Sequence, residues 1–134
     1  MAPRQRPLSP FVTIYRWPIT MVTSITHRVT GIGLALGTVL LAWWLIAVAS
    51  GPEAYRTFTT VAVNPLGQIV LYGFVWALAY HLLNGIRHLA WDVGYGFEKR
   101  TAAAASWFVI LGSLAVTALV FALVYTGHGG FNIP

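Results

Sequence analysis

The segment Val29–Pro52, VTGIGLALGTVLLAWWLIAVASGP, contains no charged side chain and decides the fold class. An α-helix rises about 1.5 Å per residue, so about 20 apolar residues cross roughly 30 Å of hydrocarbon. Only a helix or a closed barrel satisfies every backbone amide within a bilayer. We therefore predict a transmembrane helix at about 29–50, ending before Gly51-Pro52.

Two further stretches have the same character. Thr57–Ile86 contains no Asp, Glu, Lys or Arg and includes the titratable His81, and Thr101–Pro134 also contains none of these four residue types. We predict helices at about 66–91 and 104–126, with Asn64-Pro65 closing the first loop. The sequence thus predicts an all-α membrane protein of three transmembrane helices, a single membrane-anchor domain spanning residues 1–134.

The composition excludes several classes of protein. Of the 134 residues, 57% are hydrophobic and 8% are charged, which fits neither a water-soluble enzyme nor a disordered chain. The net charge of +5 is carried by few basic residues and reflects membrane topology, so we expect no nucleic-acid partner. Because the chain contains no cysteine, it forms no disulfide, thiolate metal site, iron–sulfur ligand or covalent haem link.

Residues 1–28 precede the first long apolar run and contain four prolines, so we expect an extended or broken cytoplasmic segment over at least residues 1–23. Its pattern does not fit a cleaved signal peptide. Basic residues near helix ends mark the cytoplasmic side of a membrane. They divide seven against one: Arg4, Arg6, Arg16, Arg28, Arg87, Lys99 and Arg100 against Arg56. We predict a cytoplasmic N-terminus and a C-terminus on the opposite face.

The first polar cluster lies at the cytoplasmic mouth of the first helix. Ser24 and Arg28 are four residues apart, so on a helix they point the same way and can donate hydrogen bonds to one acceptor. A quinone carbonyl gains negative charge on reduction, and these two donors would stabilise that charge. The alternative is that Arg28 only anchors the helix orientation by reaching the headgroups.

The second polar cluster surrounds His81, the most deeply placed titratable group. A neutral imidazole can ligate haem iron, and His88 returns to nearly the same helical face, where it can bond a haem propionate. Gly85 lies on that side and leaves room for a porphyrin or a neighbouring helix. Arg87 points about 120° away, toward a partner or the headgroups. The alternative for His81 is an interhelical hydrogen bond.

Two further inferences concern assembly. One deep histidine cannot supply both axial ligands of a bis-imidazole haem, so such a site requires a second polypeptide. Gly33 and Gly37 form a GxxxG pattern, which favours close packing between helices.

Several short motifs are spread along nearly the whole chain. They are Arg6-Pro7-Leu8-Ser9-Pro10, Ile14-Tyr15-Arg16, Ser24–Gly31, His81, Gly85-Ile86-Arg87-His88-Leu89 and Trp91-Asp92. In this order they resemble the cytochrome b subunit of succinate dehydrogenase. One departure is Phe11-Val12, where many relatives have His-Leu. The opening motif and Gly94-Tyr95-Gly96 are similar to alphaproteobacterial and mitochondrial versions, which implies ubiquinone as the substrate.

The resemblance implies a subunit that is not an enzyme by itself. It implies a multi-pass protein of the bacterial inner membrane, or the mitochondrial equivalent with its N-terminus in the matrix. With a second small three-helix anchor subunit in a heteromeric bundle, it would hold the iron–sulfur and flavoprotein subunits of a quinone-reducing oxidoreductase.

The resemblance also assigns residues. Ser24 and Arg28 match quinone-binding positions, and His81 matches the axial ligand of a haem b shared with the partner subunit. His27, Arg28 and His88 match positions near the quinone site and the haem propionates.

Two other functions remain open at this point. The anchor of a fumarate reductase shares this architecture and differs in quinone potential and partners. A haem-free structural or transport bundle is a second alternative. Small proton-coupled transporters commonly need an intramembrane carboxylate, and Glu53, Asp92 and Glu98 all lie outside the predicted spans.

Overall fold

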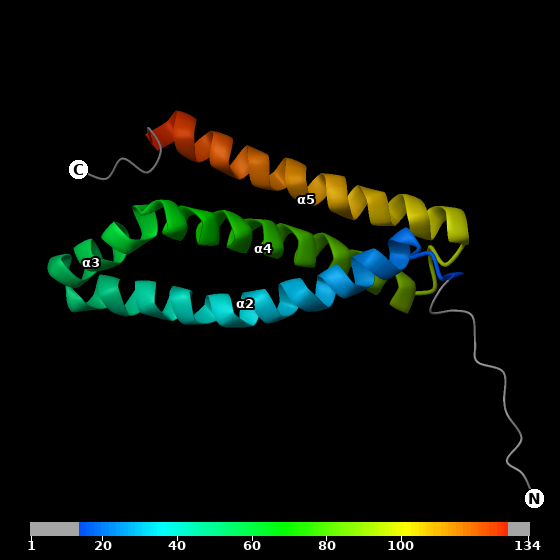
Figure 1. Cartoon of the computed structure of the whole chain (residues 1–134), viewed down its shortest axis with the longest axis horizontal. Helices are drawn as coiled ribbons and strands as arrows, with labels where there is room; N and C mark the ends of the chain where they lie inside the picture. Colours follow the sequence, from blue (N-terminus) through cyan, green and yellow to red (C-terminus); the bar gives the residue numbers. More distant parts are fainter. Residues whose placement is uncertain (1–13, 129–134) are drawn as a thin grey trace, which may run out of the picture.

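A computed structural model describes residues 14–128, which form helices and contain no strand (Figure 1). The helices are α2 (Ile19–Ser50), α3 (Pro52–Val63), α4 (Pro65–Asp92) and α5 (Lys99–His128). In Figure 1, α4 lies between α2 and α5, and the short α3 links α2 to α4 at one end. The opening Arg-Pro-Leu-Ser-Pro motif, Phe11-Val12, Arg4 and Arg6 lie outside the described residues.

Three of these helices, α2, α4 and α5, are long and apolar enough to cross a membrane. Their outward faces carry large apolar side chains such as Ile32 and Leu36, which are 65% and 68% exposed. The interior instead holds small and polar residues, including Thr23, Ser106 and Ser113, all fully buried. Apolar outside and small or polar inside is the arrangement that a lipid environment favours. The predicted fold class, an all-α membrane protein with three spanning helices, is confirmed.

Helix α2 begins at Ile19 rather than at about 29, so the expected extended or broken conformation is wrong for residues 19–23. The helix starts directly after Pro18, the last of the four prolines in residues 1–28. Pro18 is extended, and its carbonyl accepts hydrogen bonds from the amides of Met21 and Val22 in the first turn. Hydropathy indicates which residues lie in the hydrocarbon, and that run begins at Val29. The helix itself begins at Ile19, about 15 Å earlier along its axis at 1.5 Å per residue. The Ser24–Arg28 cluster is therefore helical.

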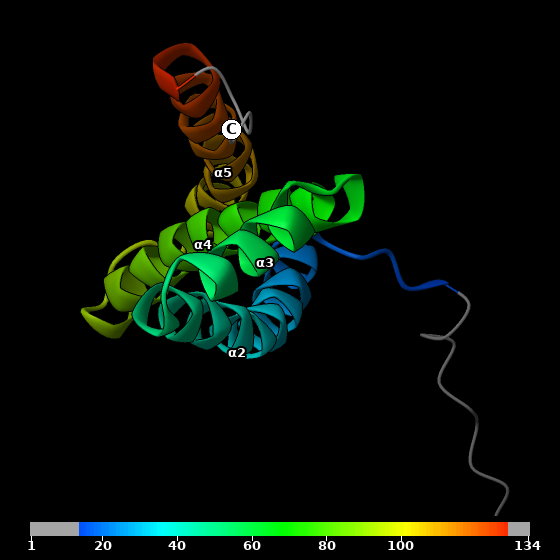
Figure 2. The same ribbon diagram turned by 90° about the vertical axis from the view of Figure 1, so that its left-hand side faces the viewer.

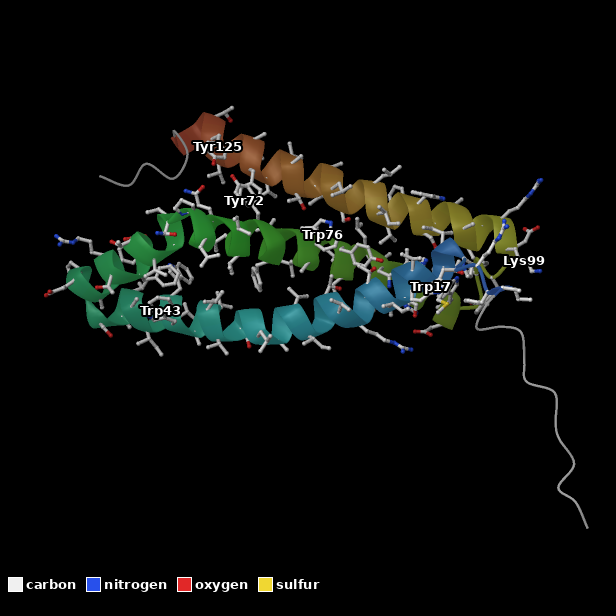
Figure 3. All side chains as sticks on the ribbon, in the orientation of Figure 1. Trp17, Trp43, Tyr72, Trp76, Lys99 and Tyr125 are labelled. Carbon is white, nitrogen blue, oxygen red and sulfur yellow. The ribbon has the colours of Figure 1, made fainter. Side chains whose placement is uncertain are left out.

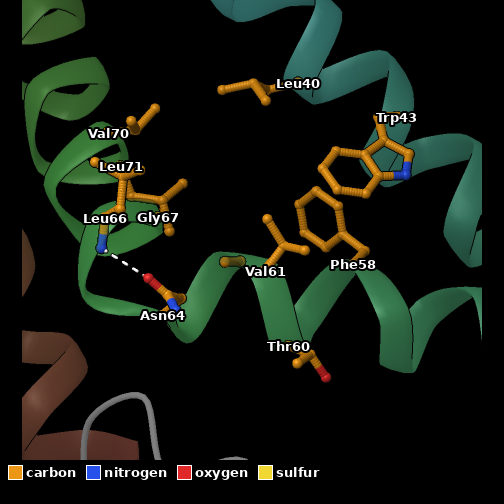
Figure 4. Close-up of a pocket in the computed structure, with 11 residues that line it drawn as sticks. Leu40, Trp43, Phe58, Thr60, Val61, Asn64, Leu66, Gly67, Val70 and Leu71 are labelled. Atoms are coloured by element: carbon orange, nitrogen blue, oxygen red, sulfur yellow. Dashed lines mark hydrogen bonds between the residues drawn. The ribbon is translucent and has the colours of Figure 1, made fainter.

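The amphipathic helix α3 was missed, because the sequence between Gly51-Pro52 and Asn64-Pro65 was interpreted as a loop. Gly51 has a φ of 107°, which favours glycine, and Pro52 occupies the first helical position, where its missing amide proton costs nothing. The Asn64 side chain caps α4 by accepting from the Leu66 amide at 3.1 Å (Figure 4).

The bounds of α4 agree with the prediction within one residue, but α5 starts at Lys99 instead of about 104. The run of alanines from Ala102 to Ala105 has the highest helix propensity, and the Ala102 amide donates to the Glu98 carbonyl at 2.8 Å. The helix therefore extends through the basic pair Lys99-Arg100. It ends at His128, two residues beyond the predicted 126.

Glycine and aromatic contacts determine how the three long helices pack. The ring of Phe74 on α4 occupies the space that a Cβ on Gly37 would need, so α2 and α4 approach closely there. Gly33 has open space around it, so only Gly37 of the predicted glycine pair makes this contact. Tyr72 and Tyr125 share a 2.8 Å hydrogen bond between α4 and α5. Figure 2 shows α5 projecting away from the α2–α4 pair.

We predict that Gly37→Ala destabilises the protein by about 1–3 kcal/mol relative to Gly33→Ala, because the added methyl group displaces Phe74. Both substitutions gain the same helix propensity, so their difference isolates the steric effect. Titration from mild detergent into SDS, followed by circular dichroism, measures the free energy of unfolding. Equal stabilities of the two variants would contradict the assigned packing.

Candidate functional site

Three imidazoles gather where α2 passes α4. His27 lies on α2 and stacks on His81 of α4, with ring centroids 3.8 Å apart and planes inclined by 15°. The same His27 ring lies 5.4 Å from the ring of His88, one heptad further along α4. The predicted common face of His81 and His88 is therefore confirmed. All three side chains are half-buried, and we call them the histidine cluster.

The surroundings of His81 come from α2. The Thr30 hydroxyl lies 3.3 Å from the His81 Nδ1, and a Cβ on Gly31 would lie 3.1 Å from the His81 Cε1. Glycine at position 31 thus lets the backbone of α2 approach the imidazole. The sequence analysis did not identify these contacts, although Thr30 and Gly31 follow His27 at the helical spacings that place them near the same face.

The cluster fits a haem better than a metal held by the protein alone. Among residues 14–128, no group of three or more His, Asp or Glu side chains is arranged to hold a metal ion. A haem needs only one axial ligand from this chain, because the porphyrin supplies four nitrogens. A Cβ built on Gly85, four residues after His81, would meet nothing within 4 Å. The face of α4 that carries His81 is thus open at Gly85.

Ser24 and Arg28 lie on α2, both on the same side of His27, and Ser24 is about 60° around the helix from it. Ser24 is half-buried and Arg28 is exposed. At 100° per residue, Arg28 points about 100° away from His27 and about 40° from Ser24. The two donors therefore share a side of the helix, and the exposed guanidinium is accessible to a ligand or to headgroups.

Arg87 points into the bundle, so the expectation that it faces a partner or the headgroups is wrong. Its side chain is 6% exposed, and its Nη1 donates to the hydroxyls of Thr23, at 3.1 Å, and of Ser106. Its guanidinium lies 4.5 Å from the centroid of the Trp91 ring. Two hydroxyls and an aromatic face hold the charge inside the protein.

These contacts tie three helices together near their junction. Thr23 belongs to α2, Arg87 to α4 and Ser106 to α5, and the Tyr80 hydroxyl adds a 2.9 Å bond to the Thr23 carbonyl. We call Thr23, Tyr80, Arg87 and Ser106 the arginine hub. Sequence analysis missed it, because its partners lie 64 and 19 residues from Arg87. Next to it, Asn84 is fully buried, and its two side-chain polar atoms have no partner in the described part of the chain.

The exposed charges divide between the ends of the bundle. Figure 3 shows Trp17 and Lys99 at one end and Trp43 near the other. The first end also carries Arg16 and Arg100, since α2 and α5 begin there, and we call it the basic end. Arg56 lies on α3 at the opposite end. The arginine hub is at the basic end and is buried, so Arg87 does not add to the exposed charge there.

A pocket of about 470 Å³ lies at the opposite end, between α2, α3 and α4 (Figure 4). Its lining is almost wholly apolar and includes Leu40, Val61 and Val70. Trp43 and Phe58 meet edge to face in its wall, with centroids 4.9 Å apart (Figure 4). It contains none of the predicted site residues, so it has no part in the chemistry of the histidine cluster.

Comparisons with known proteins agree with one another. Residues 2–120 match the family model described as "Succinate dehydrogenase/Fumarate reductase transmembrane subunit". The chain is 46% identical over 122 residues to the succinate dehydrogenase cytochrome b556 subunit of Paracoccus denitrificans, covering 90% of this chain and 94% of that protein. It is 39% identical to the subunit of the same name from Rickettsia typhi, over 87% of this chain and 91% of that one. The mitochondrial cytochrome b560 subunit of Sus scrofa is 43% identical over 95 residues, which cover 68% of this chain and 55% of that protein.

We predict that Ser106→Ala lowers the free energy of unfolding by about 1.5–3 kcal/mol, because the buried Arg87 loses a hydrogen-bond acceptor. Ser113→Ala is the matched control. Ser113 is equally buried on α5 and donates only to the Ile110 carbonyl of its own helix, so we expect a change within about 0.5 kcal/mol. SDS titration measures both, and equal losses would refute the role of the hub.

Proposed function

This chain belongs to the family of succinate dehydrogenase/fumarate reductase transmembrane subunits, and we propose that it is the haem-bearing anchor of a succinate:ubiquinone oxidoreductase. Its homologues are succinate dehydrogenase cytochrome b subunits, and its three apolar helices make it a multi-pass membrane protein. In the proposed complex, succinate is oxidised on other subunits, and this chain contributes to haem binding and quinone reduction. It is a single anchor domain and not an enzyme by itself.

The proposed partners are a second three-helix anchor subunit, the iron–sulfur subunit and the flavoprotein subunit. The outward apolar faces of α2, α4 and α5 suit contact with lipid and with another helical subunit. The basic end suits the cytoplasmic side of the membrane, where the soluble subunits would bind. The N-terminus is then cytoplasmic, and α3 lies on the opposite surface.

His81 is the proposed axial ligand of haem b. The name "cytochrome b556" of the relatives supports a b-type haem, and His81 is a half-buried imidazole on a face that is open at Gly85. His27 and His88 adjoin His81 toward the basic end. The haem propionates are proposed to be bonded or neutralised by these two residues together with Arg28. When bound, haem b supplies one-electron transfer. Its second axial ligand would come from the partner anchor.

Ser24 and Arg28 are the proposed quinone-binding residues. A quinone carbonyl gains negative charge as electrons arrive, and a guanidinium and a hydroxyl aimed at its oxygen stabilise that charge more than the neutral carbonyl. Arg28 is exposed, so its donors are accessible to such a ligand, whereas Arg87 is buried in the bundle. The exposed side of α2 would then meet the iron–sulfur subunit across the quinone.

The observation that carries this proposal is the histidine cluster within the apolar bundle of a chain of this family. The relatives named above are succinate dehydrogenase subunits, which favours that activity over a fumarate reductase anchor. A haem-free transport bundle is not favoured, because Glu53, Asp92 and Glu98 are all exposed and lie at the ends of helices or in a loop.

We predict that His81→Ala removes the b-type haem or changes its reduced-minus-oxidised spectrum, because the iron loses an axial ligand. The complex purified in mild detergent is the sample, and pyridine haemochrome analysis gives the haem-to-protein ratio. His128→Ala, at the far end of α5, is the control and should leave both unchanged. A normal spectrum in His81→Ala would refute ligation.

We predict that Arg28→Ala lowers ubiquinone reduction by on the order of 100-fold, because the developing charge on the carbonyl oxygen loses a donor. Succinate oxidation with a soluble artificial acceptor should remain near normal, since that reaction does not use this site. Arg56→Ala removes an exposed arginine at the opposite end and should leave both rates unchanged. Parallel loss of both rates in Arg28→Ala would reject the assigned role.

A further inference from the structure

The Thr30 hydroxyl contacts both residues of the stacked pair, His27 through its backbone carbonyl and His81 through its ring. It is 2.9 Å from the His27 carbonyl oxygen and 3.3 Å from the His81 Nδ1. We propose that Thr30 is a positioning residue that fixes the tautomer and orientation of His81. This inference rests on the proposed ligation of haem by His81.

The single hydroxyl proton of Thr30 sets the direction of its hydrogen bond to His81. A threonine hydroxyl has one proton to donate, and Thr30 donates it to the His27 carbonyl oxygen within its own helix. The Thr30 oxygen is therefore an acceptor toward His81, so the bond to Nδ1 forms when Nδ1 carries the hydrogen. In a neutral imidazole, the other nitrogen, Nε2, then bears the free lone pair. An iron ligand needs that lone pair.

The orientation of the ring is fixed from three directions. Thr30 holds Nδ1, the backbone of Gly31 lies against Cε1, and the His27 ring stacks on the face of the imidazole at 3.8 Å. Rotation of the ring would break the hydrogen bond at Nδ1 and disturb the stacking on His27. A hydrogen-bonded Nδ1–H also raises the basicity of a histidine ligand.

The alternative role for the Thr30 hydroxyl is a hydrogen bond to a backbone carbonyl of its own helix, with no effect on His81. Thr38 on the same helix does this, donating to the Ala35 carbonyl with the same three-residue spacing, and it is exposed. Thr30 differs because it is 4% exposed and because its oxygen reaches a side chain on another helix. Thr38 is therefore a matched control for the loss of a threonine hydroxyl from α2.

The experiment compares Thr30→Val, Thr30→Ser and Thr38→Val in the whole complex, purified in mild detergent. Thr30→Val keeps the shape of the side chain and leaves the Nδ1–H of His81 without its acceptor. We expect haem transfer to an excess of an apo-globin acceptor to become about 10-fold faster, in line with the loss of a hydrogen bond to a metal-ligating histidine. The midpoint potential should move to a more positive value, because a less basic ligand stabilises ferric iron less. Thr30→Ser should restore both values, and Thr38→Val should leave them unchanged.

Two outcomes would overturn the positioning role. Wild-type haem transfer and potential in Thr30→Val would show that the hydroxyl does not act on His81. Equal impairment of Thr30→Val and Thr30→Ser would show that the effect comes from packing. The proposed ligation fails separately: an unchanged haem spectrum in His81→Ala refutes it whatever the Thr30 variants show.

Discussion

Hydrocarbon offers no hydrogen bonds, so a polar group in the three long helices is stabilised only by a partner within the protein assembly. Most threonine and serine hydroxyls do so by donating to a carbonyl three or four residues earlier, as Thr26 and Thr117 do. The larger polar groups cannot be satisfied within one helix. Many of them gather in the half of the bundle nearer the basic end, where they form the arginine hub and the histidine cluster, whereas Tyr72 and Tyr125 pair nearer the other end (Figure 3).

Helix α4 organises both groups through its periodicity. His81, Gly85 and His88 share one face, and Tyr80, Asn84 and Arg87 share another, about a quarter-turn away at 3.6 residues per turn. The first face meets His27 and remains open at Gly85, whereas the second is buried against α2 and α5. Helix α4 therefore has one face that is buried against α2 and α5 and, next to it, a face that can accept a cofactor. The hub holds α2 and α5 against α4, and so positions His27 and Thr30 beside His81.

The sequence predicted what depends on local pattern. The three apolar spans, and the shared face of His81 and His88, follow from hydropathy and helical spacing, and both are confirmed. Hydropathy does not locate a helix start beyond the hydrocarbon, which is why Ile19 and the amphipathic α3 were missed. The inward direction of Arg87 depends on hydroxyls contributed by two other helices, so no pattern within α4 could show it.

Two arginines near the histidine cluster differ in burial. This difference separates the structural role of Arg87 from the proposed ligand-binding role of Arg28. Arg87 is surrounded by hydroxyls and Trp91, so it is held in place and has no access to a ligand outside the bundle. Arg28 lies on the outer side of α2, one residue from His27, and remains exposed. A buried charge without a carboxylate partner is costly, and the hub offsets part of this cost with the hydrogen bonds of Nη1, while Nε and Nη2 have no partner within the described residues. The exposed arginine and the open face at Gly85 lack such internal partners, and these are the places where a cofactor, a quinone and a second anchor subunit would complete the site.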